Sequence, residues 1–225
     1  MRKLTTLLVA SLLVAVVVLF AVNRVGHAQA NQAAQAGEDQ RGRVAKMIEK
    51  GDTAGAEKML MELQSKQNNH SMQPGNFHTF FEEIKACGFY PQETRLECVI
   101  DIKQLGGYAG GVGTAGSIEN VLFCVDWNND GAYNSSESVG EGSVAMHDES
   151  AGSKPNWQYA VYRDFDPRGG VRTSLNNPNL ATTISNGPTR NARAILSWFV
   201  EPTDCNYQPY WGNVVNYRIR FDPIR

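Results

Sequence analysis

Four segments of the chain place apolar side chains at every second position, which is the pattern of a half-buried β-strand. Gly, Pro and Asn residues separate these segments, as expected of short strands joined by turns. The pattern predicts a mainly β fold, an antiparallel β-sandwich with Greek-key-like topology. The alternating residues are Leu96, Cys98, Ile100 and Ile102; Trp157, Tyr159 and Val161; Ala192, Ala194, Leu196 and Trp198; and Val215, Tyr217, Ile219 and Phe221.

Residues 1–30 have the organisation of an export signal. Two basic residues precede an apolar run from Leu7 to Val22, and Ala28-Gln29-Ala30 is an A-x-A pattern of small residues. Cleavage after Ala30 would remove 30 of the 225 residues. The alternative is an uncleaved anchor, since Leu4 to Val22 is almost long enough to span a bilayer. Either way, we expect a secreted or cell-surface protein.

The chain without its signal is weakly acidic. Of its 21 basic residues, 18 would remain against 23 acidic ones, a formal charge of −5. Nucleic-acid binding needs clustered Lys and Arg side chains that neutralise phosphates. No nucleic-acid partner is therefore expected.

Four cysteines follow the predicted signal: Cys87, Cys98, Cys124 and Cys205. An oxidising compartment would allow two disulfides with three possible connectivities, and buried free thiols are the alternative. Cys87 and Cys98 flank a short turn and could close a local loop, which would leave Cys124 with Cys205 as a long-range crosslink. Because no C-x-x-C pair is present, neither a zinc site nor a thioredoxin-type motif is expected.

A short helical hairpin is predicted before the strands, within a tether-and-hairpin segment over residues 31–75. Its first apolar stripe is Val44, Met47 and Ile48, and its second is Ala56, Met59, Leu60 and Leu63. Gly51-Asp52-Thr53 between them is a stop followed by a cap. The apolar face must cover something. Two occupants remain open: the hairpin's own domain, or a surface or matrix protein or second copy of the chain.

One further helix is predicted at the start of the sandwich domain, which we place at residues 76–225. Phe77, Phe80, Phe81 and Ile84 lie at positions i, i+3, i+4 and i+7. Asn76 would be its N-cap and Gly88 its C-terminal stop.

The stretch from Asp126 to Glu137 carries the most specific chemical signal. It places oxygen-bearing side chains at positions 1, 3, 5, 9 and 12 of a twelve-residue loop, the spacing of a calcium site. The apolar run before it favours a strand over a helix, so Ca²⁺ would brace two strands rather than operate an EF-hand sensor. A solvated turn is the alternative. The predicted ligands are Asp126, Asn128, Asp130, the carbonyl of Ala132, Asn134 through water, and both oxygens of Glu137.

Other motifs do not form a catalytic set. Gly111 to Gly116 fits G-x-G-x-x-G, but a predicted strand rather than a helix follows it, so we expect an inter-strand loop. There is no H-E-x-x-H and no G-x-S-x-G, and Asp164 and Asp166 are more simply explained as turn residues or extra metal ligands. The protein is therefore not expected to be an enzyme. Tyr207, Tyr210 and Trp211 could form an aromatic platform for a sugar ring or, alternatively, pack against the sandwich edge.

The loop Val125-Asp126-Trp127-Asn128-Asn129-Asp130-Gly131 resembles the V-D-W-N-x-D-G segment of GEVED-type domains of exported and surface-attached bacterial proteins. Arg193 to Trp198, Cys205, and Gly212 to Ile219 resemble that family's R-x-R-x-S strand and closing G-E-V-E-D-Y strand. Gly212, Val214 and Tyr217 keep the family residue, whereas Asn213, Val215 and Asn216 replace three acids. The resemblance spans about Tyr90 to Phe221 and is that of a divergent relative. It implies a β-sandwich accessory module.

These patterns together lead us to expect an exported, calcium-stabilised β-sandwich protein. Its expected role is non-enzymatic, in adhesion or in the structure of the cell surface or extracellular matrix. The alternative is a carbohydrate-binding module that uses the platform around Trp211.

Overall fold

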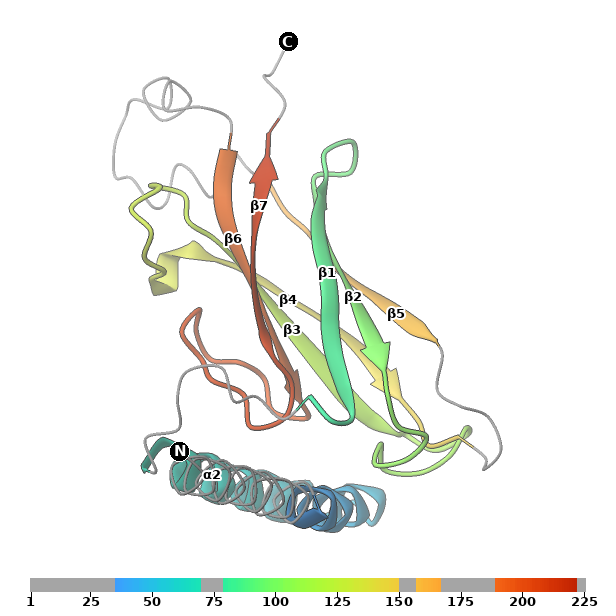
Figure 1. Ribbon diagram of the computed structural model, residues 1–225. Coiled ribbons are helices and arrows are strands. Elements are labelled where there is room, and N and C mark those ends of the chain that lie inside the picture. Colours follow the sequence, from blue (N-terminus) through green and yellow to red (C-terminus); the bar gives the residue numbers. More distant parts are fainter. Residues whose placement is uncertain (1–34, 70–78, 150–156, 167–188, 222–225) are drawn as a thin grey trace, which may run out of the picture. The chain divides into compact units, whose positions relative to one another are not determined.

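The computed structural model describes residues 35–69, 79–149, 157–166 and 189–221 (Figure 1). The predicted signal peptide lies outside these residues. The chain divides into two compact units, Met1–Arg41 and Gly42–Arg225. In the first unit, the described residues belong to the start of a helix over 35–49.

Seven strands of the second unit form two antiparallel sheets in the described part of the chain (Figure 1). One sheet has the order β1-β2-β5 and consists of β1 (Glu82–Tyr90), β2 (Arg95–Ile102) and β5 (Gln158–Asp164). The other has the order β4-β3-β6-β7 and consists of β3 (Ser117–Val125), β4 (Ser138–Met146), β6 (Thr189–Trp198) and β7 (Val214–Arg220). The predicted mainly β, antiparallel character is confirmed.

Both sheets contribute alternate side chains to one hydrophobic core. On β2 the buried residues are Leu96, Cys98, Ile100 and Ile102, and on β6 they include Ala192, Ala194, Leu196 and Trp198. These are the period-two residues of the sequence. Because the apolar faces of the two sheets meet in this core, the fold is sandwich-like.

The edges of the two sheets also meet, with β1 beside β7 and β4 beside β5. The side chain of Asn213 joins the first pair, because its Oδ1 accepts from the Ile84 N–H at 2.8 Å and its Nδ2 donates to the Ile84 carbonyl at 3.2 Å. At the second pair, a glycine of β4 permits the close approach of β5. A Cβ at Gly142 would lie 2.4 Å from the Tyr162 carbonyl oxygen.

The further helix predicted over Asn76–Gly88 is wrong: within the described residues, Glu82–Tyr90 is a strand. The helix-like spacing ends at Ile84, and just after it a β-bulge hides the strand pattern. Ile84 pairs with Ile100 and Ala86 pairs with Val99, so one residue of β1 is left over and the inward-facing positions change from even to odd numbers. Apolar residues on a bulged strand lose their period of two. Pairing with β2 therefore outweighs the local helix-like spacing.

The helical hairpin is confirmed, since α2 (Thr53–Asn69) follows the helix over 35–49. Gly51 has a φ of 80°, which allows the turn, and Asp52 Oδ1 accepts the Gly55 N–H at 3.0 Å as an N-cap. Leu60 and Leu63 are buried in the core that the sheets form. No helix in the described residues is long and apolar enough to cross a membrane.

Candidate metal loop and neighbouring pocket

The predicted calcium loop connects β3 to β4 and is anchored in the core by its second residue. Trp127 is buried, and its ring lies 5.9 Å from the Phe221 ring at an interplanar angle of 18°. The Phe165 ring also lies 5.9 Å from it. The start of the loop is therefore held by aromatic packing, apart from any ion.

Asp126, the first position of the loop, is fully buried. Its Oδ1 accepts the Asp130 N–H at 3.1 Å, and its Oδ2 accepts the Gly131 N–H at 3.0 Å. Asn191 of β6 donates its Nδ2 to the same Oδ2 at 3.3 Å. The φ of 82° at Gly131 allows the sharp turn. This carboxylate thus folds the loop and ties it to β6.

Positions 3 and 5 bond to the loop itself. Asn128 Oδ1 accepts the Asp130 N–H at 3.0 Å, and Asp130 Oδ1 accepts the Ala132 N–H at 2.8 Å. Asn128 Nδ2 also donates to Asp130 Oδ2 at 2.9 Å. A carboxylate or amide oxygen that accepts one N–H keeps further lone-pair capacity. These side chains can therefore still offer oxygens to a cation.

Glu137, the last position, is fully buried and caps the short 3-10 helix η1 (Ser135–Glu137). Its Oε2 accepts the Asn134 N–H at 2.9 Å and its Oε1 accepts the Trp127 N–H at 3.2 Å. Burial raises the pKa of Glu137, and the nearby carboxylates of Asp126 and Asp130 raise it further, against the lowering effect of those two backbone hydrogen bonds. Burial and the nearness of other carboxylates thus make the ionised form of Glu137 less favourable, and a bound cation would offset this effect.

The residues fit a calcium ion only in part. Among the described residues, no group of three or more His, Cys, Asp and Glu side chains converges as metal ligands would. Asp126, Asn128 and Asp130 lie along the loop with oxygens suited to Ca²⁺, which also accepts amide and carbonyl oxygens. Glu137, however, is turned toward two backbone amides. Such a self-bonded loop also agrees with the alternative of a plain turn.

Both disulfides of the favoured connectivity are present. Cys87 is joined to Cys98 across β1 and β2, and Cys124 at the end of β3 is joined to Cys205. The second bridge lies in a small buried cluster with Leu122 and Ile195. Two disulfides and no free cysteine indicate an oxidising environment.

The predicted aromatic platform does not form an exposed surface. Trp211 is 2% exposed and packs edge-on against Trp198 and Tyr210, with ring centroids 5.3 Å and 4.6 Å away. Tyr207 donates its hydroxyl to Gln64 Oε1 of α2 at 3.2 Å, and Gln64 donates to the Gln208 carbonyl at 2.7 Å. A sugar stacks on an exposed ring. The packing alternative, under α2 as well as at the sheet edge, accounts for these residues.

The other sequence motifs have structural roles. Arg95 binds the carboxylate of Asp164 with an N–O distance of 2.6 Å and holds the pKa of Asp164 below its usual value. The glycine-rich segment is followed directly by β3, as expected of an inter-strand loop. Asp148 orders the residues just before that segment by accepting the N–H groups of Tyr108 and Gly110 at 2.8 Å and 3.0 Å.

A shallow pocket of about 360 Å³ lies beside the loop from Asp126 to Glu137, and the sequence did not predict it. In the sheet register Asn191 pairs with Arg218 and Arg193 pairs with Asn216, so these four residues share one face of β6 and β7. The polar alternation of β6 and β7 indicated an outward face. Only the strand register brings that face together with the loop. The lining residues include Gly131, Tyr133, Asn191, Arg193, Asn216 and Arg218.

Comparisons with known proteins found no match: no family model, no curated protein and no solved structure matches this chain.

Proposed function

We propose that this is an exported, calcium-stabilised β-sandwich protein with a non-enzymatic role in adhesion or in the structure of the cell surface or extracellular matrix. The observation that carries the proposal is the buried carboxylate of Asp126. It organises the loop after β3 and is bonded to Asn191 of β6, so a cation held there would brace two neighbouring strands. The same cation would offset the effects of burial and of the neighbouring carboxylates, both of which raise the pKa of Glu137.

The proposed location is supported by two independent features. The N-terminal sequence has the pattern of a cleaved signal, and all four cysteines are in disulfides. The non-enzymatic role rests on the sequence, which contains no recognised catalytic motif.

We propose further that the connections follow a Greek key. Strands β3, β4 and β5 follow one another in space, and β6 returns to pair with β3. The helical hairpin would then act mainly as a cap on its own domain. The burial of Leu60 and Leu63, and the two hydrogen bonds of Gln64, favour this over contact with a partner.

Calorimetry with calcium and with a chelator tests the proposal. A ligand that binds only the folded state at a hundred times its Kd stabilises it by about 2.7 kcal/mol, so the Tm should rise with calcium. Asp126→Ala and Asp130→Ala should abolish the rise, whereas Asn134→Ala should only reduce it, because position 9 often binds through water. Glu149→Gln, an exposed carboxylate outside the loop, is the matched control. An unchanged Tm in calcium would refute the proposal.

A further inference from the structure

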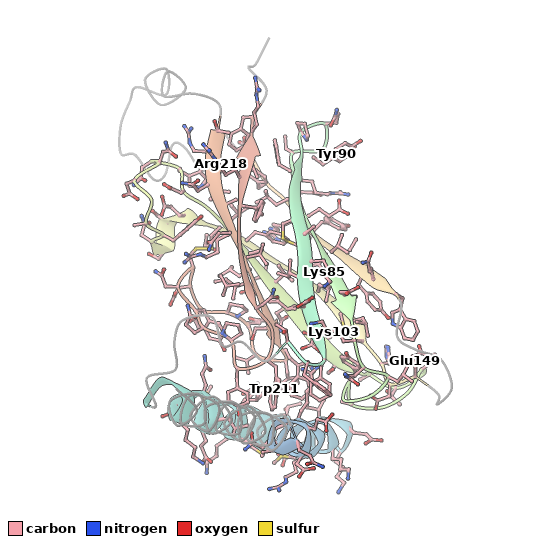
Figure 2. The ribbon with its side chains drawn as sticks, viewed as in Figure 1. Lys85, Tyr90, Lys103, Glu149, Trp211 and Arg218 are labelled. Atoms are coloured by element: carbon pink, nitrogen blue, oxygen red, sulfur yellow. A yellow bond between two sulfur atoms is a disulfide. The ribbon has the colours of Figure 1, made fainter. Side chains whose placement is uncertain are left out.

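We propose that the pocket on the outward face of β6 and β7, here called the β6–β7 pocket, binds a hexuronate, the carboxylate-bearing sugar of acidic polysaccharides. This goes beyond a structural role, and it does not depend on calcium. Arg218, labelled in Figure 2, lies on β7 and lines the pocket. The volume of the β6–β7 pocket, about 360 Å³, is within the range of small-ligand sites.

The first argument is a fixed guanidinium. Arg193 donates Nε to Asn216 Oδ1 at 2.8 Å and Nη1 to the Cys205 carbonyl at 2.9 Å. Its Cζ lies 4.2 Å from the centroid of the Tyr133 ring. A disulfide, a strand and a ring thus hold the side chain in place. No hydrogen bond involves Nη2 in the described part of the chain, so this nitrogen is left to donate to a ligand.

The second argument is unbalanced positive charge. Among the described residues, no carboxylate forms an ion pair with Arg193 or with the exposed Arg218. Two guanidinium groups on one sheet face, one of them fixed, suit the planar, two-oxygen geometry of a carboxylate.

The third argument is the neutral polar groups around the arginines. Tyr133 lines the pocket, and its hydroxyl can donate or accept a hydrogen bond. Asn216 Oδ1 accepts from Arg193, which leaves the side-chain amide hydrogens of Asn216 to donate. Asn191 donates Nδ2 to Asp126, which leaves its side-chain Oδ1 to accept. Donors and an acceptor without charge match sugar hydroxyls, which both donate and accept.

The charge of the neighbouring loop favours a single negative charge on the ligand. Asp126 is bonded to the pocket residue Asn191, and Gly131 of the same loop lines the pocket. A dianionic phosphate would meet stronger repulsion from these carboxylates than a monoanionic carboxylate would. A hexuronate combines one carboxylate with several hydroxyls in a ring of suitable size.

The test is a nuclear magnetic resonance titration of the purified ¹⁵N-labelled protein with galacturonate and its trimer, with galactose and inorganic phosphate as comparisons. Amide shifts should occur on β6, β7 and the loop with the uronates and be much weaker with galactose or phosphate. Arg218→Gln should weaken uronate binding by about tenfold or more, because it removes a charged hydrogen-bond donor. Tyr133→Phe keeps the ring beneath Arg193 and removes only the hydroxyl, so it should weaken binding less.

Arg220→Gln is the matched control, since Arg220 is exposed on the same strand face but does not line the pocket. The titration is repeated in chelator, where uronate binding should persist. Failure of the calcium proposal would then leave this result unchanged. Three outcomes would overturn the inference: no uronate shifts, equal shifts with galactose or phosphate, or equal weakening by Arg218→Gln and Arg220→Gln.

Discussion

Removing the Cys124–Cys205 disulfide should destabilise the protein more than removing Cys87–Cys98. The two bridges span sequence separations of 81 and 11 residues. A crosslink restricts the unfolded chain more when it closes a longer loop, and the chain-entropy relation gives about 4.5 kcal/mol for the first bridge and about 2.8 kcal/mol for the second. The predicted difference is about 1.7 kcal/mol.

The measurement is equilibrium unfolding in urea of two double variants, Cys124→Ala with Cys205→Ala and Cys87→Ala with Cys98→Ala. Both sulfurs of the long-range bridge are fully buried, whereas Cys87 is only partly buried, so lost packing should widen the difference in the same direction. The slope of the unfolding free energy against urea concentration should also increase more for the Cys124/Cys205 variant than for the Cys87/Cys98 variant. The unfolded chain expands more when the longer crosslink is removed. An equal or larger loss for the Cys87–Cys98 variant would refute the entropic reasoning.

Three further perturbations follow from single contacts. Trp211→Ala should cost about 3 to 5 kcal/mol in the free energy of unfolding, because it empties a buried indole site; a near-neutral result in urea unfolding would contradict the burial described above. Arg95→Gln should raise the pKa of Asp164 toward its usual value, measured from the carboxyl carbon shift. Because the folded pKa of Asp164 is lowered, its pair with Arg95 stabilises the protein at neutral pH and loses this effect as the pH falls through that pKa, so the variant should depend less on pH in the acid range. Asn213→Asp should cost about 1 to 3 kcal/mol, because it removes the donor to the Ile84 carbonyl; calorimetry at neutral pH measures it, and an unchanged Tm would show that water replaces the bond.

The sequence predicted those strands whose two faces differ regularly. The alternation on β2 was recognisable because this strand faces the core on one side only, and that on β6 because it holds from Arg190 to Ala194, before both faces of the strand are buried. The bulge in β1 removed that signal, so a strand was mistaken for a helix. Packing of Trp211 was one of two alternatives that the sequence left open, and the contacts of Tyr207 and Gln208 with Gln64 of α2, far away in the chain, were not predicted.

The candidate site was predictable only where its residues are local. The loop from Asp126 to Glu137 follows from spacing along the chain. Asn191 lies 65 residues away and reaches Asp126 only because β3 pairs with β6, with Val125 opposite Ala192. The β6–β7 pocket likewise depends on strand register, which a single sequence does not specify.

The side-chain amide of Asn213 has a consequence for solubility. An unpaired strand edge is a template on which another chain can add, and the described strands leave four such edges, on β1, β7, β4 and β5. They face one another in two seams, and at the β1–β7 seam the amide presents a donor and an acceptor to Ile84, as a neighbouring peptide group would. A carboxylate at this position would lack the donor. Loosening the seam would free two edges at once, so fibrous aggregation should be an early result of damage at Asn213.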